Sequence, residues 1–167
     1  MQMNERFATG WETTKVDQEA IAELSKRIPE RVFDAHMHLY DRAHFPQIGT
    51  MLSWGPEQVT LDDWRKLVGR QLGDQDRMVG ALVLPFPSAD LPIGPKNDFV
   101  KAETSGNQRA IRAYLVDAHT ELSDVEEHLE DEGIGGFKCY HCYSDRPDTQ
   151  QSYIDEFLPE WTWQVAD

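Results

Sequence analysis

The sequence predicts an α/β fold built around a parallel sheet. Short apolar runs that end in polar residues recur along the chain, amphipathic segments separate them, and long loops with Gly and Pro follow several of them. Alternation of buried strands with helices favours parallel pairing through right-handed crossovers. With 167 residues, of which 40% are hydrophobic, the chain has the size and composition of one domain with a packed core.

A helix and a strand open this pattern after a polar lead-in over residues 1–15. Apolar and small residues at helical spacing predict a helix over 16–27, and Pro29 separates it from the next apolar run. That run predicts the first strand over 31–39. A long loop with two glycines and two prolines comes next, over 40–59.

The second unit has the clearest helix signals. Thr60 and Asp63 form a variant of the capping box, an apolar stripe runs from there to Leu72, and Gly73 can end the helix. The nearly continuous apolar run over 78–84 then predicts a strand that is buried on both faces.

Two further strand and helix units lie in the rest of the chain. The remaining elements are predicted as a weak helix over 99–108, a strand over 111–116, a helix that Ser123 caps with Glu126, a strand over 134–143 and a last helix from Pro159. The chemistry of such folds lies at the carboxyl ends of the strands. The last helix carries no stop signal, so we expect a chain that is cut short at Asp167.

Composition excludes several classes of partner. A net charge of −14 argues against a nucleic-acid or anionic-membrane surface, where Lys and Arg would be needed. Residues 1–11 hold no apolar signal-peptide core, and no apolar run is long enough to span a membrane. Cys139 and Cys142 lie too close together for a disulfide framework, which agrees with a cytoplasmic location, and we interpret both as core residues.

A His-x-His motif ends the first predicted strand. Because side chains alternate along a strand, Asp34, His36 and His38 are expected on one face. Two imidazoles at a strand end can bind one metal ion, and Asp34 could orient one of them from behind. The alternative is a set of hydrogen-bonded polar residues without a ligand.

Lys138 is a second candidate, in the last predicted strand. Alternation places Lys138 with Gly136, Tyr140 and Cys142 on one face, and Phe137 on the other face, against the helices. A lysine inside a buried strand costs several kcal/mol if it is charged and unpaired. Two interpretations stay open: a salt-bridged structural lysine, or an amine that takes up carbon dioxide as a metal-bridging carbamate.

Residues in the loop after the first strand are candidates for substrate contact. Tyr40 and Arg42 follow the His-x-His motif directly, so we expect both to bind substrate. His44 lies in the same loop and is a weaker candidate. His128 lies on an acidic helix and is expected to face solvent.

These motifs together resemble the amidohydrolase superfamily of metal-dependent hydrolases. The segment 33–39 is similar to the His-x-His signature of that superfamily. The segment 136–138, with Tyr140, is similar to the fourth-strand lysine region of allantoinases and hydantoinases. The segment 158–166 resembles the helix that precedes the next histidine strand, so that the likeness spans about residues 30–167.

The resemblance implies a TIM (β/α)8 barrel, of which this chain would hold strands 1–4 with their helices. A whole barrel needs about 250 residues. Residues 1–30 would then be a lead-in and helix, and 31–167 the first half of a barrel truncated at its C-terminus. His36 and His38 would bind a divalent metal, and a carbamylated Lys138 would bridge it to a second ion and act in catalysis. Zinc is expected first, with manganese or iron as alternatives. The remaining ligands, two histidines and an aspartate on later strands, lie outside the chain.

The function implied by this resemblance is hydrolysis of a small molecule. A metal-activated water would attack an amide or cyclic amide C–N bond. The alternative on the same barrel is a decarboxylase or isomerase, in which an unmodified Lys138 contacts substrate. Dihydroorotases carry an arginine where Tyr40 stands, which argues against their substrate. A third hypothesis is a non-catalytic half-barrel, inactive alone, whose open edges pair with a copy of itself or with another chain.

Overall fold

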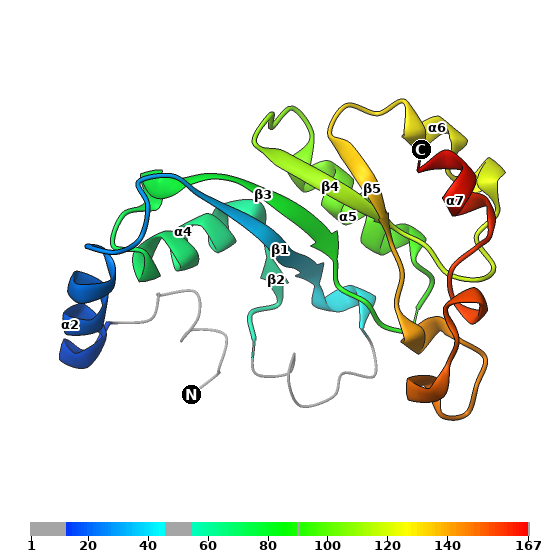
Figure 1. The fold of residues 1–167 in the computed structure, drawn as a ribbon, viewed down its shortest axis with the longest axis horizontal. Helices are drawn as coiled ribbons and strands as arrows, with labels where there is room; N and C mark the ends of the chain where they lie inside the picture. The colour runs from blue at the N-terminus through cyan, green and yellow to red at the C-terminus, as the bar shows by residue number, and fades with distance from the viewer. Residues whose placement is uncertain (1–12, 46–54, 90, 167) are drawn as a thin grey trace.

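The computed structural model of this chain describes residues 13–45, 55–89 and 91–166, and it shows a mixed α/β fold (Figure 1). A five-stranded sheet has the order β2-β1-β3-β4-β5. The strands are β1 (Val32–Asp41), β2 (Gln58–Val59), β3 (Met78–Pro85), β4 (Ala110–Leu115) and β5 (Ile134–Lys138). Most of the predicted lead-in lies outside the described residues.

The sheet is mixed, so the expectation of wholly parallel pairing was wrong. β1, β3, β4 and β5 pair in parallel as predicted. β2 instead runs antiparallel to β1, with Tyr40 opposite Val59 and Asp41 opposite Gln58. This short strand lies in the segment predicted as a loop. Two residues are too few for a hydrophobic period to reveal a strand.

Two of the helices in the described residues begin at capping boxes, of which the one before α4 was predicted. Their bounds are α2 (Lys15–Leu24), α4 (Leu61–Gln71), α5 (Gly94–Thr104), α6 (Glu126–Leu129) and α7 (Trp161–Val165). Thr60 and Asp63 cap α4 reciprocally, as predicted, and Thr14 with Asp17 does the same for α2. α5 begins earlier than predicted because Pro95 is tolerated in the first helical turn, where no intrahelical N–H bond is required.

Two predicted boundaries near the C-terminus were wrong. Ser123 does not cap α6; Glu121 and Asp124 form a reciprocal box that starts a 3-10 turn, and α6 is only four residues long. β5 ends at Lys138 rather than at residue 143, because the chain turns into a 3-10 helix over His141–Tyr143. The side chains after Lys138 therefore lie above the end of the sheet rather than within it.

The hydrophobic core lies between one face of the sheet and the helices α4 and α5. Its buried members come from β1, β3, β4 and α5: Met37, Leu39, Ala81, Val83, Val100 and Ala110. Trp64 of α4 and Phe99 of α5 pack against this cluster. Figure 1 shows α2 and α7 at opposite ends of the molecule, so neither lies over the middle of this core.

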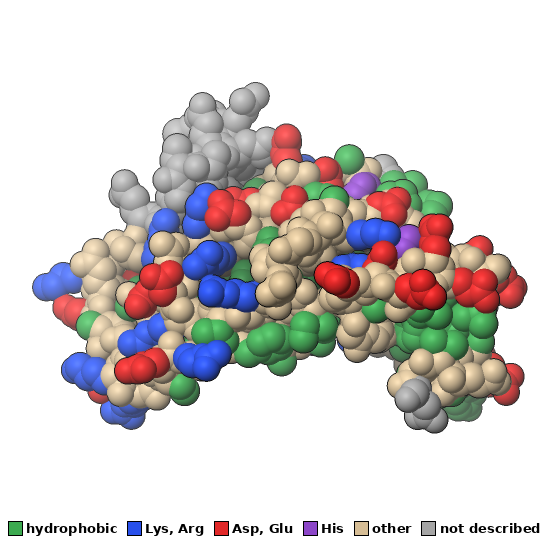
Figure 2. All heavy atoms as spheres, turned by 90° about the horizontal axis from the view of Figure 1, so that it is seen from above, with side chains coloured by type: hydrophobic (Ala, Val, Ile, Leu, Met, Phe, Trp, Pro, Cys, Tyr) green, Lys and Arg blue, Asp and Glu red, His purple; other side chains and the backbone are tan. Residues whose placement is uncertain are grey.

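The other face of the sheet carries exposed apolar side chains. Phe33 is 46% exposed and Ile111 is 41% exposed, and strand register places both on the face away from the core. The Phe33 ring covers Gly80, where an added Cβ would lie 3.0 Å from ring carbons. Figure 2 shows hydrophobic side chains gathered along a hollowed side of the molecule. In the part of the chain described, no helix is long and apolar enough to cross a membrane.

Candidate functional site

A β-bulge in β1 separates Asp34 from the two histidines, so the prediction of one shared face was wrong. Asp34 pairs with Ala81 and Met37 with Val83, so that β1 has one residue more than β3 between these positions. Such an extra residue inverts the alternation. Asp34 therefore faces the core, where its carboxylate accepts hydrogen bonds from the Trp64 indole at 3.1 Å and from the His36 backbone N–H at 3.0 Å. It holds the backbone of the motif rather than an imidazole.

The two imidazoles of the motif converge at the carboxyl end of β1. His36 Nε2 lies 3.1 Å from His38 Nε2. His38 Nδ1 lies 3.1 Å from the carbonyl oxygen of Pro85, at the end of β3. Because a carbonyl only accepts, Nδ1 carries the proton and donates it. The Nε2 lone pair of His38 then faces both His36 Nε2 and the Tyr140 hydroxyl.

The surroundings of His38 favour its neutral form. Burial lowers the pKa of His38 below its ordinary value, and the nearby His36 and Lys138 act in the same direction, while the hydrogen bond to Pro85 opposes them. The Phe86 ring packs edge-on against the imidazole with centroids 5.5 Å apart. A neutral imidazole is the form that binds metal.

Tyr140 joins this site, although the sequence analysis did not name it as a site residue. Its hydroxyl oxygen lies 3.2 Å from His38 Nε2. The available signal was its position two residues after Lys138, on the same predicted face. Burial raises the pKa of Tyr140, so its hydroxyl stays protonated and can donate a hydrogen bond at neutral pH.

Lys138 lies beside Tyr140, on the face that strand alternation predicted. Its Nζ is 4.6 Å from the centre of the Tyr140 ring, a cation–π contact. Phe137 lies on the opposite face, where its ring meets Trp161 of α7 with centroids 5.2 Å apart. Among the described residues, no carboxylate lies within salt-bridge distance of Lys138, so the interpretation of a salt-bridged structural lysine finds no partner there.

The predicted substrate contacts lie near the site but differ in their surroundings. The Tyr40 hydroxyl donates to the Pro56 carbonyl at 3.3 Å, and its ring meets Phe86 with centroids 6.0 Å apart. Arg42 begins the 3-10 turn that follows β1 and is partly exposed. His44 instead packs edge-on against Phe99 of α5, on the core side of the sheet.

His128 was predicted to face solvent, and this prediction was wrong. Its side chain is only 14% exposed, and it stacks on Tyr114 with ring centroids 5.2 Å apart. Its Nδ1 lies 3.3 Å from Asp131 Oδ2. Cys139 and Cys142 are free thiols and partly buried, and burial raises the pKa of both, which makes them poor thiolate ligands.

The histidine pair fits two ligands of a divalent cation. With bonds of about 2.1 Å, a separation of 3.1 Å corresponds to an angle of about 95° at the ion, between octahedral and tetrahedral values. Across residues 13–45, 55–89 and 91–166, no group of three or more His, Cys, Asp or Glu side chains could hold a metal. The described residues thus supply two imidazole ligands and no carboxylate or thiolate to complete the set.

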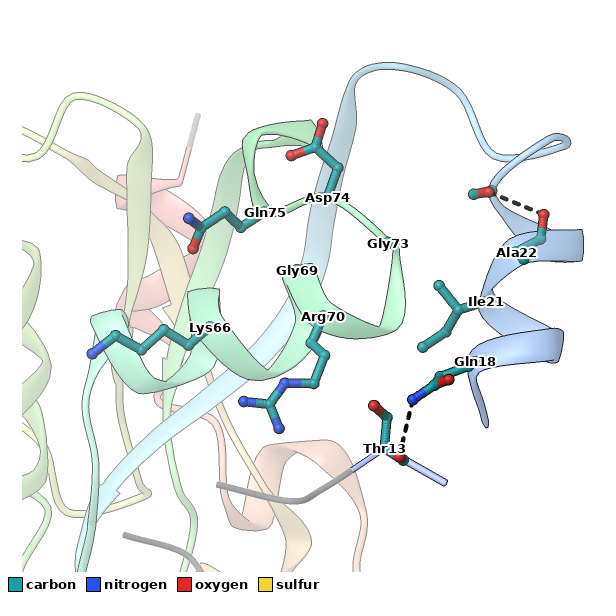
Figure 3. Close-up of a pocket in the computed structure, with 11 residues that line it drawn as sticks. Thr13, Gln18, Ile21, Ala22, Lys66, Gly69, Arg70, Gly73, Asp74 and Gln75 are labelled. Carbon is teal, nitrogen blue, oxygen red and sulfur yellow. Dashed lines mark hydrogen bonds between the residues drawn. The ribbon is translucent and has the colours of Figure 1, made fainter. Parts of the chain in front are cut away.

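An open pocket on the surface lies elsewhere. It has a volume of about 610 Å³ and is formed between α2 and α4, near the turn that leads into β3 (Figure 3). Figure 3 shows Ile21 of α2 directed toward Gly73, where an added Cβ would lie 3.1 Å from the isoleucine methyl. Its walls are mainly the surfaces of two helices, and Lys66 on its rim is paired with Asp62. The chemistry-bearing side chains lie at the opposite end of the strands.

Comparison with known proteins gives no family for this chain. No protein-family model, no curated protein and no solved structure matches it. The function therefore has to be inferred from the geometry of the residues described above.

Proposed function

We propose that this chain carries part of the active site of a metal-dependent enzyme of the amidohydrolase type. The proposed reaction is hydrolysis of an amide or cyclic amide C–N bond in a small molecule. The observation that supports it best is the pair of converging imidazoles, of which His38 has its tautomer set by the Pro85 carbonyl. Histidines that bind metal are held in this way by backbone or carboxylate acceptors.

The partial TIM barrel of the sequence analysis remains part of this proposal. Four parallel strands, with helices covering one face and the polar site at their carboxyl ends, agree with such a fragment. His36 and His38 would hold a divalent ion, zinc first. The ion would supply an activated water and polarise the bond to be broken. The other ligands would come from a carbamylated Lys138, from water, or from segments outside the described residues.

A decarboxylase or isomerase is the second candidate, and the position of Lys138 favours it. A cation–π contact with Tyr140 stabilises the charged ammonium. Carbamate formation requires the neutral amine instead. In this second candidate, Lys138 stays unmodified and contacts the substrate, while the histidine pair keeps its role.

The metal site can be tested with Co²⁺, whose absorbance in the visible range reports its coordination. The protein is titrated with Co²⁺ beside the variant His36→Ala/His38→Ala and the matched control His119→Ala/His128→Ala. We expect the first variant to bind Co²⁺ at least about 100-fold more weakly than the unaltered protein, because two ligands are lost. The control should bind like the unaltered protein, since neither of its histidines lies at the site.

Equal Co²⁺ affinity in the unaltered protein and in His36→Ala/His38→Ala would contradict the proposal. Far-ultraviolet circular dichroism of each variant separates loss of ligands from loss of fold. A spectrum with the intensity of octahedral rather than tetrahedral Co²⁺ would favour magnesium-like or manganese-like coordination over zinc.

A further inference from the structure

We propose that Lys138 and Tyr140 form an anchor for the carboxylate of an anionic, planar ligand, beside the histidine pair. This inference rests on the second candidate function, in which Lys138 stays unmodified and contacts the substrate, and it adds the chemical class of the ligand. The side chains that meet at the carboxyl end of the parallel strands are His36, His38, Lys138 and Tyr140. They offer an ammonium group, a hydroxyl and imidazole nitrogens.

The charge balance at this end of the strands is the first observation that supports the anchor. The chain as a whole has a net charge of −14, yet the described residues place no carboxylate in a group with the two histidines or within 4.0 Å of Lys138. Asp34 is turned to the other face by the bulge in β1. Asp41 accepts hydrogen bonds from the Ala43 backbone N–H in its own turn and from the side chain of Gln58 on β2. A half-buried cation without an anionic neighbour gains from a ligand that brings one.

The positions of the donors are the second support. Tyr140 Oη lies 3.2 Å from His38 Nε2, and Lys138 Nζ lies 4.6 Å from the centre of the same tyrosine ring. The ammonium group of Lys138 and the hydroxyl of Tyr140 therefore lie close enough together for one small ligand to contact both. Lysine and tyrosine both donate to carboxylate oxygens, and hydrogen bonds to a charged acceptor are the stronger kind.

The aromatic residues beside the donors are the third support, and they indicate a flat ligand. The Phe86 ring meets His38 with centroids 5.5 Å apart and Tyr40 with centroids 6.0 Å apart. Phe45 is buried at 2% exposure and supports the Phe86 ring from behind, with centroids 5.5 Å apart. Aromatic walls of this kind favour planar groups through stacked or edge-on contacts. A planar carboxylate satisfies both the walls and the donors.

The test compares benzoate with its neutral isostere benzamide, which has the same shape and no charge. Binding of each is measured by isothermal calorimetry, with and without stoichiometric Co²⁺. We expect benzoate to bind at least about 10-fold more tightly than benzamide, because one charge-assisted contact is lost in the amide. Lys138→Met should reduce this preference to about 2-fold or less. Tyr140→Phe should weaken benzoate binding about 5-fold.

Two control variants make the result specific to the anchor. Lys15→Met removes a charge at 89% side-chain exposure on α2 and should leave the benzoate preference unchanged. Lys138→Arg keeps the positive charge and cannot form a carbamate, and it should retain most of the preference. Thermal unfolding of each variant shows whether it is folded.

Several outcomes would overturn the anchor. They are equal binding of benzoate and benzamide, an unchanged preference in folded Lys138→Met, or no benzoate binding at tens of millimolar. Loss of Co²⁺ binding in both Lys138→Met and Lys138→Arg would show that Lys138 is a metal ligand, and this would overturn it too. If no Co²⁺ binds to any of the proteins while the preference still depends on Lys138, the metal proposal fails and the anchor stands.

Discussion

Two histidine–lysine neighbourhoods in this molecule have opposite surroundings. On the core side, Lys101 Nζ lies 3.1 Å from His128 Nδ1, and the carboxylate of Asp131 lies 2.7 Å from that lysine. At the carboxyl end of the sheet, Lys138 lies near His38 and contacts the Tyr140 ring, and no carboxylate of the described residues pairs with it. One neighbourhood contains its own counter-charge, and the other does not.

The difference separates structural electrostatics from electrostatics that can serve a ligand. Asp131 also binds Arg112, whose side chain is only 7% exposed, at 3.1 Å. It therefore neutralises buried positive charge where α5, β4 and the segment after α6 meet. Buried charges are retained in folded proteins when they are paired in this way. A cation beside His38 without such a partner is a cost to folding that a ligand could offset.

Of the substitutions that test this difference, Asp131→Asn should have the largest effect on the free energy of unfolding. The substitution removes the carboxylate and leaves the buried Arg112 without its anionic partner. We expect a loss of about 2–3 kcal/mol in the free energy of unfolding, measured by urea denaturation. Glu127→Gln is the matched control, because Glu127 contacts His128 from the solvent side at 81% exposure. A difference below about 0.5 kcal/mol between the two variants would contradict the structural role of Asp131.

The dependence of stability on acidic pH should also report the role of the Asp131 carboxylate. Hydrogen bonding from Lys101 holds the pKa of Asp131 below its ordinary value of 3.8, while burial opposes this shift. A group with a depressed folded-state pKa stabilises the protein above its unfolded pKa, and this stability is lost as the pH falls through the folded pKa. The gap in unfolding free energy between the unaltered protein and Asp131→Asn should thus shrink from about pH 5 to pH 2.5. A gap that widens on acidification would contradict the shift.

The smallest effect should distinguish the two lysines directly. Lys101→Met removes a partner of Asp131 that is 42% exposed, so we expect a loss of about 0.5–1 kcal/mol in the free energy of unfolding. Lys138→Met should change it by less than about 0.5 kcal/mol or stabilise the protein, because no carboxylate partner is lost. Urea denaturation of the two variants in parallel tests this. A larger loss for Lys138→Met than for Lys101→Met would show that Lys138 has a structural role.

The sequence predicted those parts of the fold that depend on local pattern. Continuous apolar runs identified β3 and β4, and a capping box identified the start of α4. β2 was missed, because its two residues owe their strand conformation to pairing with β1 rather than to their own propensity. His128 was misplaced because its burial depends on Tyr114 and Asp131, which only the packing of α6 brings to it.

Of the candidate site, the sequence identified residues more reliably than it identified their directions. His36 lies beside His38, and Lys138 lies beside Tyr140, as alternation within each strand predicts. Asp34 faces the other way because of a bulge between Asp34 and Met37, and the hydrophobic pattern of this mixed segment gives no sign of it. The proximity of β1 and β5 side chains depends on sheet order, which the motifs alone do not determine.

The contact between His38 and the Pro85 carbonyl has a consequence for how this protein tolerates mutation. The proton of His38 is placed by a main-chain oxygen, and that oxygen is brought into range by the pairing of Leu39 with Pro85. Replacing the side chain at position 85 leaves a carbonyl there. An alanine scan would therefore miss this partner of His38. Substitutions at position 85 during evolution would likewise leave the carbonyl acceptor in place. The tautomer of His38 thus depends on the register between β1 and β3 rather than on the side chain at position 85.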